Sequence, residues 1–165
     1  MSKKNLEIKI LDCTLRDGGY YNNWDFSPAL IKDYLESMVS IKVDYVEIGF
    51  RFISNNDFKA GCAFSTDNYI NSLSIPHALK NKIGVMINGS DVLSQGNSTN
   101  DIDEVLKGLF KPRKKSPVSL VRIACHLHEF EYCLPAVTWL KGQGYKVGFN
   151  LMQINNASDE SITEV

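Results

Sequence analysis

The sequence predicts an α/β protein built on a parallel sheet. Short apolar runs rich in Val and Ile alternate with longer segments in which apolar residues recur at helical spacing. This β/α unit repeats every ~35 to 40 residues, which is within the range of βαβ units. With 165 residues, of which 44% are hydrophobic and 22% charged, the chain is long enough for one core. We therefore expect a single domain over residues 1–165.

The predicted strands are the β-branched apolar runs. In the first of them Ile8, Ile10 and Leu11 are expected to be buried, so that the residues after Cys13 stand beyond the carboxyl end of the strand. The five predicted strands are residues 7–13, 45–50, 83–88, 119–125 and 146–152.

The predicted helices lie between these strands. Ser27 is a candidate N-cap before Pro28 at the first helical position, and Gly142 and Gly144 are a typical helix stop before the last strand. The predicted helices are residues 28–39, 66–73, 101–110 and 129–142, and Ser158 is the expected cap of a further helix at the end of the chain.

Two polar segments are predicted to be loops. Residues 89–100 are rich in Ser, Asn and Gly and are expected to form a surface loop. Residues 111–117 are strongly basic and are expected to form a solvated turn at the amino end of the sheet, without a ligand. The residue pattern leaves two architectures open: an open doubly wound sheet, or the first part of a closed barrel, which takes about 250 residues.

Charge and composition restrict the partners. Lys and Arg number 18 against 19 Asp and Glu, so the net charge of -1 gives no reason to expect nucleic acid or an anionic membrane as a partner. The sequence has neither an apolar run of ~18 residues nor a signal-peptide pattern, so we expect a cytoplasmic protein. Its four cysteines are far apart in the sequence, and none of them forms a C-x-x-C pair. This spacing favours reduced, buried thiols.

The strongest site candidate follows the first strand. Arg16 and Asp17 precede the pair Gly18-Gly19, at the end of the sheet where parallel α/β proteins carry their chemistry. Two adjacent glycines permit a close or left-handed turn that a phosphate, a carboxylate or a metal can approach. The alternative is a structural Arg-Asp ion pair that caps the sheet.

Three motifs in chain order carry a family resemblance. They are Asp12-Cys13-Thr14-Leu15-Arg16-Asp17-Gly18-Gly19, then Val46-Glu47-Ile48-Gly49-Phe50-Arg51, and last Val121-Arg122-Ile123-Ala124-Cys125-His126 with Gly148-Phe149-Asn150-Leu151-Met152. The first resembles the first-strand motif of the metal-dependent lyase and aldolase superfamily that includes hydroxymethylglutaryl-CoA lyase, isopropylmalate synthase and 4-hydroxy-2-oxovalerate aldolase. The second is similar to the second strand of that superfamily, and the third to strands four and five of the aldolase branch.

The resemblance implies a TIM barrel, of which residues 1–165 are the N-terminal five or so units. It also implies a divalent metal, Mg²⁺ or Mn²⁺, with Asp17 as a ligand, Arg16 holding an enolate oxygen and Glu47 orienting Arg16. Carboxylate oxygen suits a hard cation, and a guanidinium stabilises developing enolate charge.

Two departures from the family pattern matter. Tyr20 stands where the family carries Gln or His, and a tyrosine with an ordinary pKa near 10 needs a neighbouring cation to act as the base. The family metal site also uses a His-x-His pair on a later strand, beyond Val165. His126-Leu127-His128 is the alternative pair, but it follows the fourth predicted strand, which is too early for the family pair.

Other candidates stand at strand ends. Asn88, His126 and Gln153 are candidate substrate-binding residues, although Asn at such a position often caps a turn. Arg51, after the second strand, is expected either to meet a carboxylate or to be a solvated loop cation.

The leading prediction is an aldolase-type lyase that acts on a 2-oxo acid or a related carbonyl compound through a metal-stabilised enolate. Residues 1–165 alone are expected to be inactive. A Claisen-type acyl-CoA condensing enzyme or lyase is the alternative within the family. The alternative of another class is a non-catalytic binding or interaction domain. The open sheet edges of a half-barrel would invite pairing with another copy of the chain, and we therefore expect that the chain can form a homo-oligomer.

Overall fold

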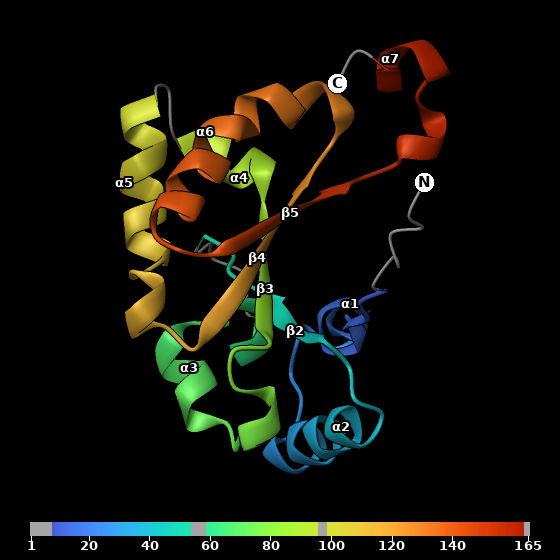
Figure 1. The fold of residues 1–165 in the computed structure, drawn as a ribbon, viewed down its shortest axis with the longest axis vertical. Helices are drawn as coiled ribbons and strands as arrows, with labels where there is room; N and C mark the ends of the chain where they lie inside the picture. The colour runs from blue at the N-terminus through green and yellow to red at the C-terminus, as the bar shows by residue number, and fades with distance from the viewer. Residues whose placement is uncertain (1–7, 54–58, 96–98, 164–165) are drawn as a thin grey trace, which may run out of the picture.

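The computed structural model of the chain describes residues 8–53, 59–95 and 99–163. Five parallel strands form one sheet in the order β1-β2-β3-β4-β5 (Figure 1). The strands are β1 (Leu11–Asp12), β2 (Tyr45–Phe50), β3 (Ile83–Asn88), β4 (Val118–Cys125) and β5 (Lys146–Leu151).

Helices connect the strands. α3 and α5 lie to the left of the strands in Figure 1 and α2 lies below β2, while α1 lies beside β2 and α7 follows the end of β5. The α-helices are α1 (Thr14–Gly18), α2 (Pro28–Ser40), α3 (Asp67–Ser72), α4 (Gly89–Gln95), α5 (Thr99–Leu109), α6 (Phe130–Gly142) and α7 (Asp159–Thr163). Short 3-10 turns include Gly19–Tyr21, Gly61–Ala63, Arg113–Lys115 and Leu127–Glu129.

The strand order decides between the two architectures that the sequence left open. A doubly wound sheet reverses its strand order at a switch point, whereas here each strand pairs with the next one in the chain. Right-handed crossovers in that order place the helices on one side of the sheet. The sheet is therefore a curled half-barrel, as the resemblance implies.

The hydrophobic core lies between the sheet and its helices. Successive strand residues face opposite sides, and the paired residues Val85 and Val121 point toward the helices together with their neighbours Ile87 and Ile123. The helices contribute the buried residues Ile31, Leu35, Leu106, Ala136 and Leu140. The opposite, concave face of the sheet is thereby left for the polar residues described below.

Most elements match the prediction. β2 and β3 have the predicted bounds, and β4 and β5 differ from them by one residue. The Ser27 hydroxyl accepts a hydrogen bond from the Leu30 amide at 3.2 Å, and Ser158 accepts one from Ser161, so both predicted helix caps are confirmed. The basic segment 111–117 lies at the amino end of β4 as expected.

Two predictions were wrong. Residues 89–95 of the expected surface loop form α4, because Val92 is buried against the sheet and gives this polar segment an anchor. The first strand is shorter than expected: Ile8 and Ile10 are 86% and 56% exposed, and the residues before 8 lie outside the described part of the chain.

Among the described residues, no helix combines the length and apolarity that a membrane crossing requires.

Candidate functional site

The site is organised around a buried carboxylate, Glu47, in the middle of β2. Its side chain is 0% exposed, although an ionised carboxylate is costly to bury without partners. Glu47 is flanked in the strand by Val46 and Ile48, which face the helices, so alternation turns its carboxylate to the concave face of the sheet.

Two guanidinium groups hold the Glu47 carboxylate. Arg122 on β4 donates from Nε to Oε1 at 2.9 Å and from Nη2 to Oε2 at 2.8 Å, which is a two-pronged contact. Arg16 on α1 donates from Nε to Oε2 at 2.8 Å. Both arginine side chains are largely buried, so the three groups form an ion cluster with little water around it. The hydrogen bond to Glu47 raises the pKa of Arg122, which keeps this guanidinium charged.

Asp17 is the exposed end of this cluster. Its Oδ1 atom lies 2.5 Å from Nη1 of Arg16, and its side chain is 61% exposed. The two residues stand in α1, one helical turn beyond the end of β1, and not in a turn directly after the strand as predicted. Gly18 and Gly19 have right-handed helical dihedrals, so of the close or left-handed turn that the two glycines permit, the left-handed form is not used.

Gly19 has another purpose, which is close packing. A Cβ atom at Gly19 would lie 1.9 Å from the Trp24 ring, so only glycine lets the indole sit there. The Trp24 Nε1 atom donates to the carbonyl oxygen of Arg16 at 2.9 Å. The indole thus fixes the backbone that carries Arg16.

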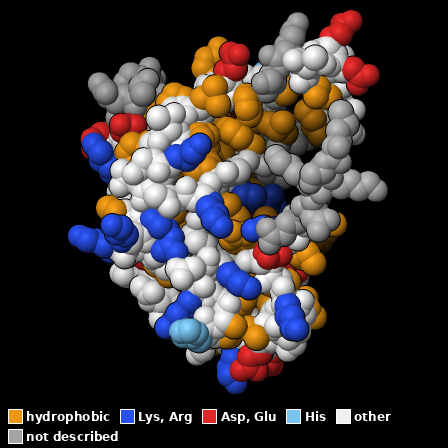
Figure 2. Space-filling model, in the orientation of Figure 1, with side chains coloured by type: hydrophobic (Ala, Val, Ile, Leu, Met, Phe, Trp, Pro, Cys, Tyr) orange, Lys and Arg blue, Asp and Glu red, His pale blue; other side chains and the backbone are white. Residues whose placement is uncertain are grey.

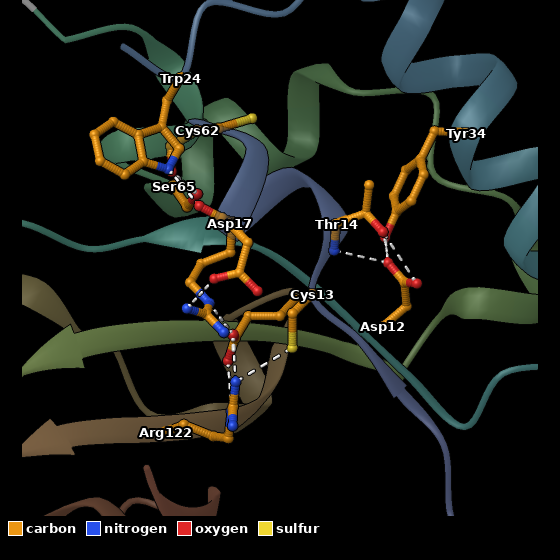
Figure 3. Close-up of polar contacts among 11 residues, drawn as sticks. Asp12, Cys13, Thr14, Asp17, Trp24, Tyr34, Cys62, Ser65 and Arg122 are labelled. Atoms are coloured by element: carbon orange, nitrogen blue, oxygen red, sulfur yellow. Dashed lines mark hydrogen bonds and ion pairs between the residues drawn. The ribbon is translucent and has the colours of Figure 1, made fainter. Parts of the chain in front are cut away.

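Asp12 and Cys13 point to opposite sides of the chain (Figure 3). Asp12 accepts hydrogen bonds from the Thr14 amide at 2.9 Å and the Tyr34 hydroxyl at 2.5 Å, and this joins β1 to α2. The Cys13 Sγ atom accepts a hydrogen bond from Nη2 of Arg122 at 3.2 Å. Burial and the charge of Glu47 raise the pKa of the Cys13 thiol, although Arg16 and Arg122 act in the opposite direction. Asp12 is therefore a structural residue, whereas Cys13 belongs to the ion cluster.

Tyr20 lies beside the cluster and is 63% exposed. Its ring contacts Trp24 edge to face, with the centroids 4.8 Å apart, and lies 6.0 Å from Phe50. Burial raises the pKa of the Tyr20 hydroxyl above 10; Arg16 lowers it and Asp17 raises it. A tyrosine in this environment keeps its proton near neutral pH, which suits a hydrogen-bond donor or an acid.

The other predicted site residues stand at the carboxyl ends of β3, β4 and β5. Asn88 donates to Oδ2 of Asp91 at 3.2 Å, across the start of α4. The backbone amide of His126 donates to Oε2 of Glu129 at 2.8 Å, and Gln153 is exposed with a left-handed backbone. Within the described residues no hydrogen bond or ion pair joins these three side chains to the Glu47 cluster. The structure thus brings together Arg16, Asp17 and Glu47 and leaves the other three at the same end of the sheet.

Sequence reasoning assigned no role to Arg122. The available signal was its position inside an otherwise apolar strand, because a charged residue between Val121 and Ile123 must find a partner.

Sequence reasoning left two alternatives for Arg51, a carboxylate partner or a solvated position in a loop. That side chain is 3% exposed, pairs with Asp67, and donates to the carbonyl oxygens of Ser65 and Leu109 at 2.9 and 2.7 Å. Arg51 meets a carboxylate of the protein itself and is structural.

The described residues do not form a metal site. No three His, Cys, Asp or Glu side chains among them are grouped as metal ligands would be. Asp17 offers one carboxylate, which faces Arg16. The rings of His126 and His128 stack in parallel with their centroids 5.6 Å apart, and His128 is exposed.

Comparisons with known proteins find similarity at the level of structure. No family model matches the chain, and no curated protein matches its sequence. The chain is similar to a crystal structure described as the N-terminal domain of a putative aldolase from Bacteroides vulgatus, with 26% sequence identity and a TM-score of 0.69. The similarity covers 96% of this chain and 50% of that one, so the chain spans half the length of its relative.

Proposed function

We propose that the chain is part of an aldolase-type carbon–carbon lyase that acts on a 2-oxo acid through an enolate, whose oxygen is held by Arg16. The observation that carries the proposal is the way in which Glu47 holds Arg16. Glu47 engages only the Nε atom of that guanidinium, at 2.8 Å. Of the two terminal nitrogens, Nη1 contacts the exposed carboxylate of Asp17, which an anionic oxygen of the substrate would replace.

The structural relative supports the class of reaction. The solved protein is described as the N-terminal domain of a putative aldolase, and the chain shares the fold of half of that solved domain. Our residue assignments go beyond that likeness and rest on the contacts of Arg16, Glu47 and Arg122.

The charges of the cluster suit an enolate. Cleavage of a carbon–carbon bond beside a carbonyl leaves the electron pair shared between carbon and oxygen, and a fixed cation near that oxygen lowers the barrier. Arg16 and Arg122 carry two positive charges against the single negative charge of Glu47. The exposed carboxylate of Asp17 completes the balance, and an anionic substrate would compete with it for Arg16. Tyr20, which keeps its proton, would then donate a hydrogen bond or a proton to the enolate.

No step of this proposal passes through a metal, because the described residues provide no grouped set of ligands. Asp17 as a ligand of Mg²⁺ or Mn²⁺ stays a prediction. A titration with Mn²⁺ of the wild-type protein beside Asp17→Asn tests it: equal affinity of the two proteins would remove Asp17 from any metal site.

The decisive experiment detects the enolate without knowledge of the second product. Pyruvate is incubated with the protein in D₂O, with and without Mg²⁺ or Mn²⁺, and the loss of methyl protons is followed by NMR. We expect exchange with the wild type and a loss of at least ~100-fold in rate for Arg16→Gln, since removal of one oxyanion donor commonly has such an effect. Arg113→Lys, at the opposite end of the sheet, is the matched control and should exchange like the wild type.

The alternatives give different outcomes of the same experiment. Exchange of the acetyl methyl protons of acetyl-CoA, but not of pyruvate, would identify an acyl-CoA enzyme. If the protein exchanges neither compound under any of these conditions, the enolate proposal is wrong and a non-catalytic binding domain replaces it.

A further inference from the structure

Four aromatic rings form a continuous cluster beside Arg16, which we call the aromatic wall: Tyr20, Trp24, Phe50 and Phe52. Phe50 and Phe52 are stacked, with their centroids 4.3 Å apart and their planes at 9°. Trp24 meets Phe50 and Phe52 edge to face at 5.7 and 5.3 Å. Trp24 and Phe50 are buried, whereas Tyr20 is largely exposed and Phe52 is half-buried. The inner pair thus anchors the wall, and the outer pair presents aromatic surface to a ligand.

The backbone of the wall is held in an uncommon conformation. Asn23 and Trp24 both have positive φ angles, 56° and 58°, which residues other than glycine rarely adopt. The Trp24 amide donates to the Gly19 carbonyl oxygen at 3.0 Å, and the indole nitrogen of Trp24 donates to the carbonyl oxygen of Arg16 at 2.9 Å. Such conformations persist where surrounding contacts determine them, and they concentrate at functional sites. The wall is therefore fixed to the same backbone as the proposed enolate-binding arginine.

The wall also has a cation at each end. The Arg16 guanidinium carbon lies 5.9 Å from the centroid of Phe50, and the Lys59 Nζ atom lies 4.6 Å from the centroid of Phe52. On the face that Figure 2 shows, Lys and Arg side chains lie set back between hydrophobic side chains. A ligand with its carbonyl end at Arg16 would extend its adjoining group along the exposed surface of the aromatic wall.

We propose that the aromatic wall selects a 2-oxo acid whose side chain is an aromatic ring. This inference rests on the function proposed above. A flat ring against the exposed surface of the wall buries apolar area and gains offset or edge-to-face contacts with the aromatic rings there. Pyruvate has only a methyl group at that position and leaves the wall uncovered.

Calorimetric titration of the protein with three 2-oxo acids tests the selection. The ligands are pyruvate, 4-methyl-2-oxopentanoate and phenylpyruvate, which carry a methyl, a branched aliphatic and an aromatic group. We expect phenylpyruvate to bind at least ~10-fold more tightly than the other two, which corresponds to about 1.4 kcal/mol. Equal affinity of phenylpyruvate and the branched compound would overturn the aromatic selection.

Phe52→Ala tests the aromatic wall separately from the rest of the site. It removes one ring of the wall and changes no residue to which the proposed enolate chemistry gives a role. The variant should lose most of the preference for phenylpyruvate and keep its affinity for pyruvate. Phe52→Leu keeps much of the apolar volume without the ring, and it serves if the alanine variant does not fold. Tyr132→Ala on α6, another exposed aromatic residue, is the matched control and should keep the preference.

The two proposals fail in different ways. If pyruvate binds and Arg16→Gln abolishes its binding, but Phe52→Ala leaves the ligand preference unchanged, only the aromatic selection is wrong. If none of the three 2-oxo acids binds, both proposals are wrong.

Discussion

Arg122 donates hydrogen bonds to both carboxylate oxygens of Glu47, from Nε to Oε1 at 2.9 Å and from Nη2 to Oε2 at 2.8 Å, although the two residues are 75 positions apart in the chain. This contact joins β4 to β2 across the concave face of the sheet. Because Glu47 is held by Arg122, its remaining capacity to accept hydrogen bonds can fix Arg16. The orientation of the proposed enolate-binding group therefore depends on a residue two strands away from Glu47.

Replacement of Glu47 should be severely destabilising. Glu47→Gln keeps the size of the side chain but leaves Arg122 without a carboxylate partner and Arg16 with only the exposed carboxylate of Asp17. We expect a loss of about 3–5 kcal/mol in the free energy of unfolding, measured by urea denaturation. Glu104→Gln, which removes the exposed partner of Lys107, is the matched control and should leave stability unchanged. Similar stability of the two variants would contradict a structural role for the Glu47 charge.

The buried pair of Arg51 and Asp67 gives a second prediction. Arg51→Met leaves the Asp67 carboxylate buried and without its cation, and Oδ2 of Asp67 already lacks a hydrogen-bond partner. We expect a loss of about 3–5 kcal/mol in the free energy of unfolding. The double variant Arg51→Met, Asp67→Leu should recover a large part of that loss, because no unpaired charge remains. Additive losses in the double variant would show that the two side chains do not depend on each other.

Gly19→Ala tests the packing of Trp24 against the backbone next to Arg16. A methyl group at this position overlaps the indole, so we expect a loss of about 1–3 kcal/mol and a change in the near-ultraviolet circular dichroism of tryptophan. In Gly108→Ala the added methyl group meets no atom within 4 Å, and the replacement should stabilise α5 by about 0.5–1 kcal/mol. An unchanged tryptophan signal in Gly19→Ala would mean that the indole is not held against Gly19.

Stability should fall at alkaline pH, in part through Cys133. Burial, with Cys125 and Glu129 nearby, raises the pKa of the Cys133 thiol from 9.0 to about 12. The folded protein thus holds this proton more tightly than the unfolded chain does. The resulting stabilisation is complete below pH 9 and is lost as the pH rises toward 12.

The measurement compares urea denaturation of the wild type and Cys133→Ala at about pH 8 and about pH 10.5. We expect the wild type to lose more stability than the variant over this interval, since the variant lacks the thiol but shares every other titrating group. Equal losses in the two proteins would exclude a contribution from Cys133.

The sequence by itself determined most of the elements and the class of the fold. β2 and β3 were predictable to the residue because their β-branched apolar runs are local signals, and Ser27 marks the start of α2 through a contact only three residues away. Arg16, Asp17 and Glu47 were found as candidates because each stands in a motif that can be read along the chain.

Only the tertiary structure decided how these residues are used. The partners of Glu47, the burial of Arg51 against Asp67 and the attachment of Trp24 to Arg16 all depend on distances in space. Ile8 and Ile10 are exposed although their sequence pattern is that of a buried strand. The physical reason is that apolar periodicity specifies only which face of an element can be covered. What covers that face, and which buried charges pair, follows from where separate elements meet in the folded chain.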